Sequence, residues 1–159
     1  MNIRFLVDAD SFPVLARNVL MKAAFKHKIP LLFFAKRRPA APSQELIEFV
    51  QAANHEGAAD FLILATAMQD DLVFTRDIPL AETLAQRDIL VLNDRGAIFT
   101  KENASERRSI RDASAEIRAA GLATMPGKSY GQHELAAFAN AFDRVLQRRL
   151  SQKDPPTNV

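Results

Sequence analysis

Short apolar runs alternate with amphipathic segments along the first hundred residues of the chain. Residues 3–7 and 31–36 are mostly apolar runs of strand length, and residues 14–28 between them carry apolar side chains at helical spacing. Pro13 stands at the start of this helix, where its missing N–H costs no hydrogen bond. A strand, a helix-length crossover and a second strand predict a parallel pair that is buried on both faces.

The same alternation continues through the middle of the chain. Residues 58–68 follow Gly57, and their alanine, leucine and methionine content favours a helix. Residues 71–77 and 89–93 predict two further strands, and a turn with a glycine follows at 94–96. Residues 45–52 fit either a strand or a helical turn, since neither periodicity is complete, and a strand is preferred.

The last third of the chain predicts helices. Asn103 with Glu106, and later Ser129 with Gln132, resemble capping boxes; the first helix is expected to stop at Gly121 and the second carries an apolar stripe to about residue 150. Residues 151–159 are rich in proline and polar groups and predict a flexible tail. We therefore expect one α/β domain over residues 1–150. Its fold would be a three-layer αβα sandwich with a mostly parallel central sheet and a helical C-terminal third.

Composition narrows the class of protein. The 159 residues are 48% hydrophobic and 25% charged, which is typical of one globular domain with a substantial core. No apolar run reaches the roughly 18 residues of a membrane helix, and Arg4, Asp8 and Asp10 come too early for a secretory signal. With no cysteine, a disulfide framework, a thiolate metal site and a cysteine nucleophile are excluded. We expect a cytoplasmic protein.

Basic residues gather in three places, although the formal net charge is only +2. An uneven distribution of this kind can form a basic face opposite an acidic pocket. Charged helix faces are usually only solvated, so the cluster that directly follows a predicted strand is the better candidate for contact with nucleic-acid phosphates. The clusters are Lys36, Arg37 and Arg38 after that strand; Arg107, Arg108 and Arg111 on a helical face; and Arg144, Arg148 and Arg149 near the C-terminus.

Aspartates stand at the ends of the predicted strands. Asp8 and Asp10 follow the first strand, Asp77 ends the strand at 71–77, and Asp60 opens the helix after Gly57. The carboxyl ends of parallel strands meet at one edge of the sheet, where ligands of open α/β sheets bind. Converging carboxylates repel one another unless they are neutralised, and Mg²⁺ or Mn²⁺ prefers such oxygen ligands. The four aspartates are therefore candidate metal ligands and catalytic residues for phosphodiester hydrolysis.

Each of these aspartates also has an ordinary structural interpretation. Asp10, Asp60 or Asp77 would suit a helix N-cap. For Asp8 together with Asp10 a functional role is favoured, because two acids after a buried strand exceed what one cap requires. Two further acids, at 70 and 71, precede a strand and are expected to cap or end a turn at the opposite edge of the sheet.

Six motifs, taken together and in order, carry a family resemblance: VDADSFP (7–13), AAD (58–60), DLVFTRDIPLA (71–81), LNDRG (92–96), RRSIRD (107–112) and FANAFD (138–143). They resemble the YaiI/YqxD family of bacterial proteins over nearly the whole chain up to about residue 149. That family is similar to PIN-like domains, whose better-known members are Mg²⁺- or Mn²⁺-dependent ribonucleases with acids at the carboxyl edge of a parallel sheet. The resemblance implies that Asp8, Asp10, Asp60 and Asp77 match those acids.

The chain departs from the family pattern near these acids. Members usually read D-A-D-A-C-P, whereas Ser11 and Phe12 stand here and no thiol takes part. Members commonly carry an acid or an amide after the aspartate that matches Asp60, where this chain has Phe61. This substitution is expected to remove a metal ligand or a neighbouring contact. Ser11 is expected to contact phosphate or to cap the helix.

Three functions fit these residues. The favoured one is a metal-dependent nuclease that acts on RNA or single-stranded nucleic acid. The second is a non-catalytic nucleic-acid or partner-binding module, which the nearly neutral charge and Phe61 keep open. The third is a haloacid-dehalogenase-like phosphatase, which also places D-x-D after the first strand. Phe12 stands where such enzymes carry threonine or valine, and their late acid pair follows a strand rather than preceding it, so this function is the least favoured.

Overall fold

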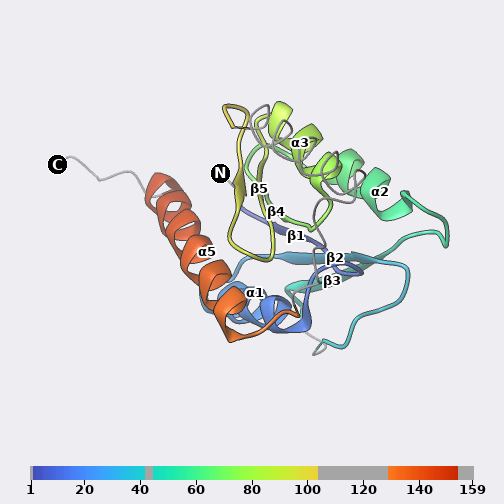
Figure 1. Cartoon of the computed structure of the whole chain (residues 1–159), viewed down its shortest axis with the longest axis horizontal. Coiled ribbons are helices and arrows are strands. Elements are labelled where there is room, and N and C mark those ends of the chain that lie inside the picture. Colours follow the sequence, from blue (N-terminus) through green and yellow to red (C-terminus); the bar gives the residue numbers. More distant parts are fainter. Residues whose placement is uncertain (1, 42–44, 104–128, 154–159) are drawn as a thin grey trace, which may run out of the picture.

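A six-stranded sheet runs through the middle of the molecule, with helices on both sides (Figure 1). The computed structural model describes residues 2–41, 45–103 and 129–153 of the chain. The strands are β1 (Phe5–Asp8), β2 (Leu31–Ala35), β3 (Ile47–Gln51), β4 (Leu72–Phe74), β5 (Leu90–Leu92) and β6 (Ile98–Phe99). The helices in these ranges are α1 (Val14–His27), α2 (Ala58–Thr66), α3 (Ile78–Gln86) and α5 (Gln132–Lys153).

The strand order is β3-β2-β1-β4-β5-β6. The pairs formed among strands β1 to β5 are all parallel, and β6 pairs antiparallel with β5. The chain builds outward from β1 through β2 to β3 and then returns to place β4 and β5 on the other side of β1. The order therefore reverses between β1 and β4, and open α/β sheets bind their ligands outside the carboxyl ends of the strands at such a switch point.

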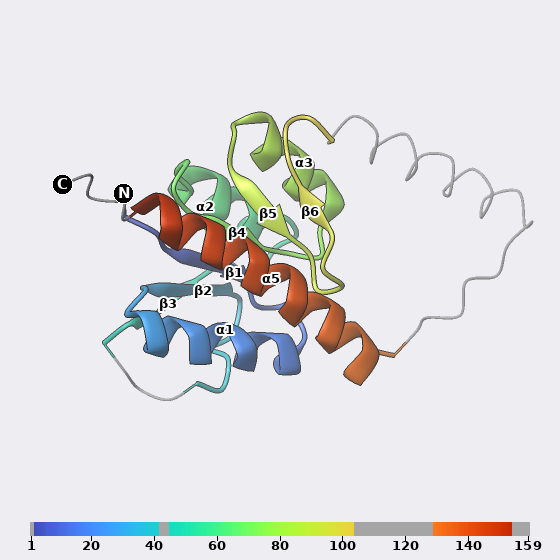
Figure 2. The ribbon, with the colours of Figure 1, turned by 90° about the vertical axis from the view of Figure 1, so that its left-hand side faces the viewer.

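Helices cover both faces of the sheet. In Figures 1 and 2, α1 and α5 lie on one face, and α2 and α3 lie on the other. Alternate residues of β1 supply the two cores: Phe5 and Val7 pack in the core under α1 and α5, and Leu6 packs in the core under α2 and α3. The predicted α/β class with a mostly parallel sheet between two helical layers is confirmed.

The sequence pattern predicts most of the described elements closely. The strands expected at 3–7, 31–36, 71–77 and 89–93 are β1, β2, β4 and β5. The ambiguous segment at 45–52 is β3, a strand that pairs with β2 through all five of its residues. The helix expected between Asn103 and Gly121 falls on residues 104–128 and so lies outside the described residues.

The long helix α5 differs from its prediction at both ends. The capping box proposed for Ser129 and Gln132 is wrong, because the backbone N–H of Gly131 donates to Glu134 Oε2 at 2.9 Å. At the other end, α5 continues to Lys153, three residues into the segment expected to be a tail. No helix in the described part of the chain combines the length and apolar character needed to cross a membrane.

Phenylalanine rings anchor the loop after β1 to the core. Phe12 is buried, and its ring contacts Phe138 of α5 and Phe74 of β4 edge to face, with ring centroids 5.5 and 6.2 Å apart. Aromatic pairs of this geometry add to the free energy of apolar burial. Phe12 therefore has a packing role, and it positions the loop that carries Asp10 and Ser11.

Candidate functional site

Asp8 is the last residue of β1 and is almost completely buried, with 5% of its surface exposed. Its Oδ2 accepts hydrogen bonds from Ser11 Oγ and Thr75 Oγ1, both at 2.8 Å. Burial raises the pKa of Asp8, the hydrogen bonds from Thr75 and Ser11 oppose that change, and the charges of Asp77 and Asp10 add to it. The carboxyl group is thus held in one orientation at the end of the central strand.

Asp77 follows β4 and begins α3. Its Oδ1 accepts from the backbone N–H of Leu80 at 2.9 Å, so the predicted N-cap is confirmed. The backbone N–H of Asp77 donates to Thr75 Oγ1 at 3.0 Å. Thr75 therefore connects the backbone of Asp77 to the side chain of Asp8 across the switch point.

Asp60 lies in the first turn of α2, on the same face of the sheet as α3. Burial, the charges of Asp77 and Asp8, and a hydrogen bond to the Asp77 side chain together raise the pKa of Asp60 to about 6. The capping interpretation of Asp60 is wrong, because Gly57 occupies the N-cap position. Three carboxyl groups from β1, α2 and the start of α3 thus interact with one another.

Asp10 lies near Asp8, whose pKa its charge raises, but its side chain bonds elsewhere. The chain turns immediately after Asp8, with the N–H of Phe12 donating to Asp8 O at 3.1 Å, so the expectation that Asp8 and Asp10 share one face of an extended strand is wrong. Asp10 is exposed, and its Oδ2 accepts from the backbone N–H of Lys36 at 2.9 Å. Pro13, not Asp10, occupies the N-cap position of α1. Asp10 therefore ties the loop after β1 to the end of β2.

The arrangement of the carboxyl groups limits how this site could hold a metal ion. Among the residues that the structure describes, no three His, Cys, Asp or Glu side chains are arranged to hold a metal ion together. The closest carboxyl interaction is that of Asp60 with Asp77. Mg²⁺ commonly binds proteins through only one or two carboxylates and keeps several waters. The pair fits this mode of binding, with Asp8 as a neighbouring charge.

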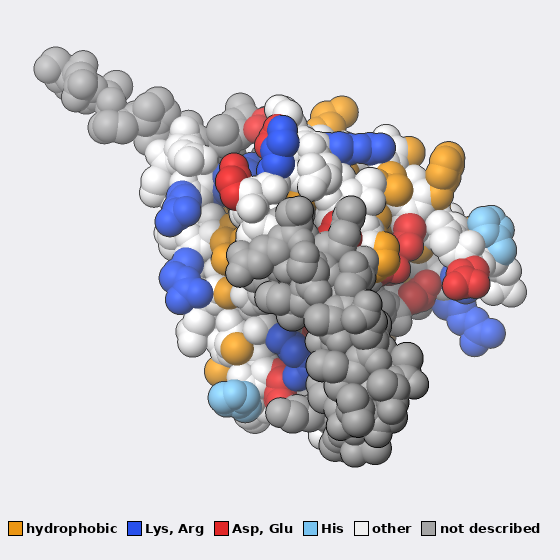
Figure 3. Space-filling model, turned by 45° about the horizontal axis from the view of Figure 1, so that its top comes forward, with side chains coloured by type: hydrophobic (Ala, Val, Ile, Leu, Met, Phe, Trp, Pro, Cys, Tyr) orange, Lys and Arg blue, Asp and Glu red, His pale blue; other side chains and the backbone are white. Residues whose placement is uncertain are grey.

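Three basic residues stand at the carboxyl end of β2, the strand that pairs with β1. Lys36, Arg37 and Arg38 directly follow this strand and are exposed. On the right-hand side of Figure 3, acidic side chains lie close to basic and hydrophobic ones. The other predicted nucleic-acid contacts, Arg107, Arg108 and Arg111, lie outside the described residues.

Phe61 is a large apolar side chain in contact with water, with 71% of its surface exposed. It follows Asp60 in α2 and lines a shallow hollow of about 230 Å³ together with Ala53, His55 and Leu62. The sequence identifies Phe61 only as a substitution that removes a possible metal ligand. An apolar residue type does not by itself indicate that the side chain is exposed. Its position beside an acidic edge makes it a candidate contact for a flat ligand. Thr75 is also not identified as a site residue from the sequence. Its position two residues before Asp77, in the motif TRD, is the sequence feature that points to it.

Other acids have structural partners. Asp71 is buried at the opposite edge of the sheet, where Arg4 donates to its two oxygens at 2.9 and 2.7 Å and the N–H of Met68 donates at 2.8 Å. This confirms the expectation that Asp71 ends a turn before β4. Asp94, after β5, is also buried and forms an ion pair with Arg76 at 3.2 Å.

Comparisons with known proteins extend the resemblance noted in the motifs. The profile of a family described as "Uncharacterized BCR, YaiI/YqxD family" matches residues 6–148. A UPF0178 protein of Treponema denticola is 38% identical over 151 residues, which cover 95% of this chain and 96% of the relative. UPF0178 proteins of Bordetella avium and Desulfotalea psychrophila are each 37% identical, covering 94% and 92% of this chain and 97% and 99% of the relatives. No solved structure matches the chain significantly.

Proposed function

This chain belongs to the YaiI/YqxD family, and from its own residues we propose that it is a Mg²⁺- or Mn²⁺-dependent nuclease, PIN-like in its site, that acts on RNA or single-stranded nucleic acid. The observation that carries the proposal is that Asp8, Asp60 and Asp77 interact at the switch point of the sheet, where burial and the charges of the other two acids raise the pKa of Asp60 to about 6. Perturbed carboxyl groups in such positions are typical of functional sites.

The donor chemistry of the acidic pair suits a hard divalent cation. The charge of Asp77 and a side-chain hydrogen bond with Asp77 both raise the pKa of Asp60, so this carboxyl group keeps its proton to a higher pH. A Mg²⁺ or Mn²⁺ ion in place of that proton would neutralise both charges. When bound, such an ion would supply a Lewis acid for the scissile phosphate and a water molecule of lowered pKa.

The surrounding residues have separate roles in this proposal. Asp60 would hold the ion together with Asp77, because these two carboxyl groups interact. Asp8 adds negative charge in a fixed orientation, because Ser11 and Thr75 hold its Oδ2. Lys36, Arg37 and Arg38 would hold the phosphates that flank the cleaved bond. Phe61 would stack on one base of a single strand.

The test combines metal binding with cleavage. We expect Mn²⁺ to bind the wild-type protein in calorimetry and to support cleavage of a fluorescent single-stranded RNA. Asp77→Asn should abolish both while the helix stays capped, because asparagine is as good an N-cap as aspartate. Asp60→Asn should have the same effect. Asp143→Asn, on the exposed side of α5, is the control and should change neither.

A binding module without turnover is the second candidate. It is favoured by the structural hydrogen bonds that Asp10 and Asp77 already make with backbone N–H groups, and by the lack of a three-residue metal group among the described residues. Salt-sensitive RNA binding with no cleavage in either Mg²⁺ or Mn²⁺ would support it and would rule out the nuclease. Unchanged cleavage in Asp60→Asn and Asp77→Asn would instead show that the acids are not the catalytic site.

A further inference from the structure

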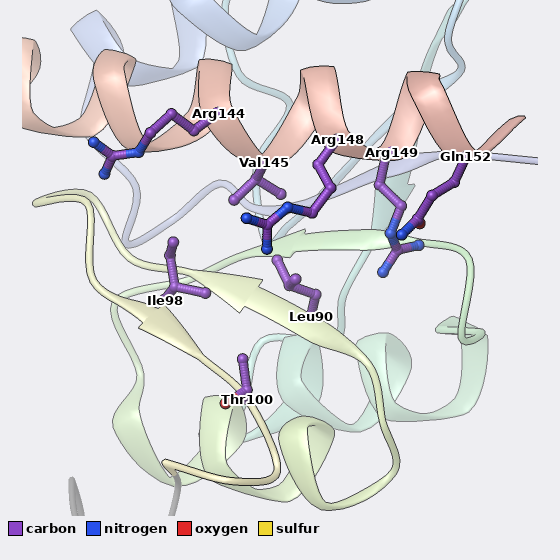
Figure 4. A pocket seen from close by; sticks show the side chains of 8 residues that line it. All are labelled: Leu90, Ile98, Thr100, Arg144, Val145, Arg148, Arg149 and Gln152. Atoms are coloured by element: carbon purple, nitrogen blue, oxygen red, sulfur yellow. The ribbon is translucent and has the colours of Figure 1, made fainter. Parts of the chain in front are cut away.

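A groove separates the C-terminal half of α5 from the edge of the sheet formed by β5 and β6 (Figure 4). Its volume is about 360 Å³, within the range of small-molecule sites. It lies on the sheet face that α1 and α5 cover, whereas Asp60 and Asp77 belong to elements of the other face. The lining residues are Leu90, Ile98, Thr100, Arg144, Val145, Arg148, Arg149 and Gln152.

The walls of the groove divide into a cationic side and an apolar side. Three arginines from α5 supply the cationic side, and Leu90, Ile98 and Val145 supply apolar surface. In Figure 4, the side chain of Arg148 extends from α5 toward Leu90, and Arg149 and Gln152 lie together at one end. None of the eight described lining residues is acidic. A ligand that fills the groove would therefore meet positive charge and apolar surface together.

The arginines differ in how they are held. Arg149 donates to the carbonyl oxygens of Gln69 and Asp70 at 3.3 and 3.1 Å, which fixes its guanidinium group at the end of the groove. Arg144 and Arg148 are exposed, and neither forms an ion pair with another residue in the described ranges. Basic residues near a helix C-terminus are also favoured by the helix dipole. The dipole does not explain why these arginines border a groove with an apolar floor.

We propose that this groove binds a nucleoside phosphate, either as a free nucleotide or as one nucleotide of a single-stranded RNA. The phosphate would bind Arg148, whose side chain extends from α5 toward Leu90, because a guanidinium group matches phosphate oxygens through paired hydrogen bonds. The base would lie against Leu90, Ile98 and Val145, with the Thr100 hydroxyl and the Gln152 amide able to bond its polar edge. Inorganic phosphate would leave the apolar floor uncovered, and an uncharged nucleoside would leave the arginines unpaired.

Calorimetric titration of the full chain tests this binding. The probes are the four nucleoside 5′-monophosphates, adenosine, inorganic phosphate and a six-residue oligouridylate. We expect at least one monophosphate or the oligonucleotide to bind, and adenosine and phosphate to bind at least tenfold more weakly. Tighter binding of the oligonucleotide than of uridine 5′-monophosphate assigns the site to RNA, and the reverse assigns it to free nucleotides; both results support the proposal.

Two variants place the ligand in the groove. Arg148→Gln should weaken binding at least tenfold and, because Arg148 is exposed, should leave the protein folded. Lys22→Gln, a charge-matched change at an exposed position of α1, should leave affinity unchanged. Ligand-induced NMR shifts at Thr100 and Gln152 provide a second measurement.

The proposal is overturned if neither the monophosphates nor the oligonucleotide saturates the protein. It is also overturned if inorganic phosphate binds as tightly as the nucleotides, or if Arg148→Gln binds like wild type. An equal loss of affinity in Lys22→Gln would show attraction to net positive charge rather than a specific groove, and would overturn it as well.

Discussion

The hydroxyl of Thr75 donates a hydrogen bond to Asp8 Oδ2 at 2.8 Å, joining residues 67 positions apart. The same Thr75 oxygen accepts from the backbone N–H of Asp77 at 3.0 Å. The Thr75 hydroxyl therefore positions both the side chain of Asp8 and the backbone of Asp77. The contact lies between the ends of β1 and β4, where the strand order reverses.

Replacing this hydroxyl should disturb Asp8 directly. In Thr75→Val, the charged form of Asp8 loses a hydrogen bond in a buried position, so its pKa should rise further and the free energy of unfolding at pH 7 should fall by about 1–3 kcal/mol. Thr75→Ser keeps the hydroxyl and should keep most of the stability. Urea unfolding and NMR titration of the Asp8 carboxyl group measure the two effects. An unaltered Asp8 pKa in Thr75→Val would contradict this role.

The acidic site should make the protein less stable as the pH rises. The pKa of Asp60 is about 6 in the folded chain, above its ordinary value of 3.8, so the folded state binds more protons than the unfolded state between these pH values. The free energy of unfolding should therefore fall from about pH 4 to about pH 6 and then level off, with Asp8 acting in the same direction. Urea unfolding across this range should show a smaller fall in Asp60→Asn than in the control Asp143→Asn. Equal falls in both variants would exclude Asp60 as the cause.

Phe61 should contribute to nucleic-acid affinity without contributing to stability. If Phe61 stacks on a base, Phe61→Ala should weaken binding of single-stranded RNA by about 5- to 150-fold, the equivalent of about 1–3 kcal/mol. The matched control is Met68→Ala, because Met68 has a similar exposed fraction of 67% but follows the other end of α2. Fluorescence anisotropy measures affinity, and thermal unfolding should be unchanged in both variants. A similar loss in both would indicate a nonspecific effect of apolar surface.

The turn between β5 and β6 should not tolerate a side chain at Gly96. Its φ is +85°, and a Cβ atom there would lie 2.6 Å from the carbonyl oxygen of Ala137 in α5. Gly57 has a similar φ of +80° but has open space around its Cβ position. Gly57→Ala should therefore cost only backbone strain of about 1 kcal/mol, whereas Gly96→Ala should cost clearly more because α5 must also shift. Urea unfolding of the two variants measures the difference, and equal costs would show that α5 does not restrict the turn.

The sequence by itself determined the strands β1, β2, β4 and β5, the parallel sheet, and the edge to which Asp8, Asp60 and Asp77 belong, but not β6. This was possible because each apolar run has to be buried and because parallel strands place their carboxyl ends together. Local pattern also identified Asp77 as a cap and Asp71 as a residue at the opposite edge. These properties depend on neighbours within a few positions along the chain.

Only the tertiary structure decided which side chains meet. Thr75 meets Asp8 because β4 lies beside β1, and Phe12 is buried because α5 places Phe138 against it. Asp10 bonds to the end of β2 because the chain turns after Asp8. The groove lined by arginines exists because α5 passes beside β5 and β6. Hydrophobic periodicity states which residues must be buried but not which element buries them. Contacts between distant segments therefore follow from the order in which strands and helices pack.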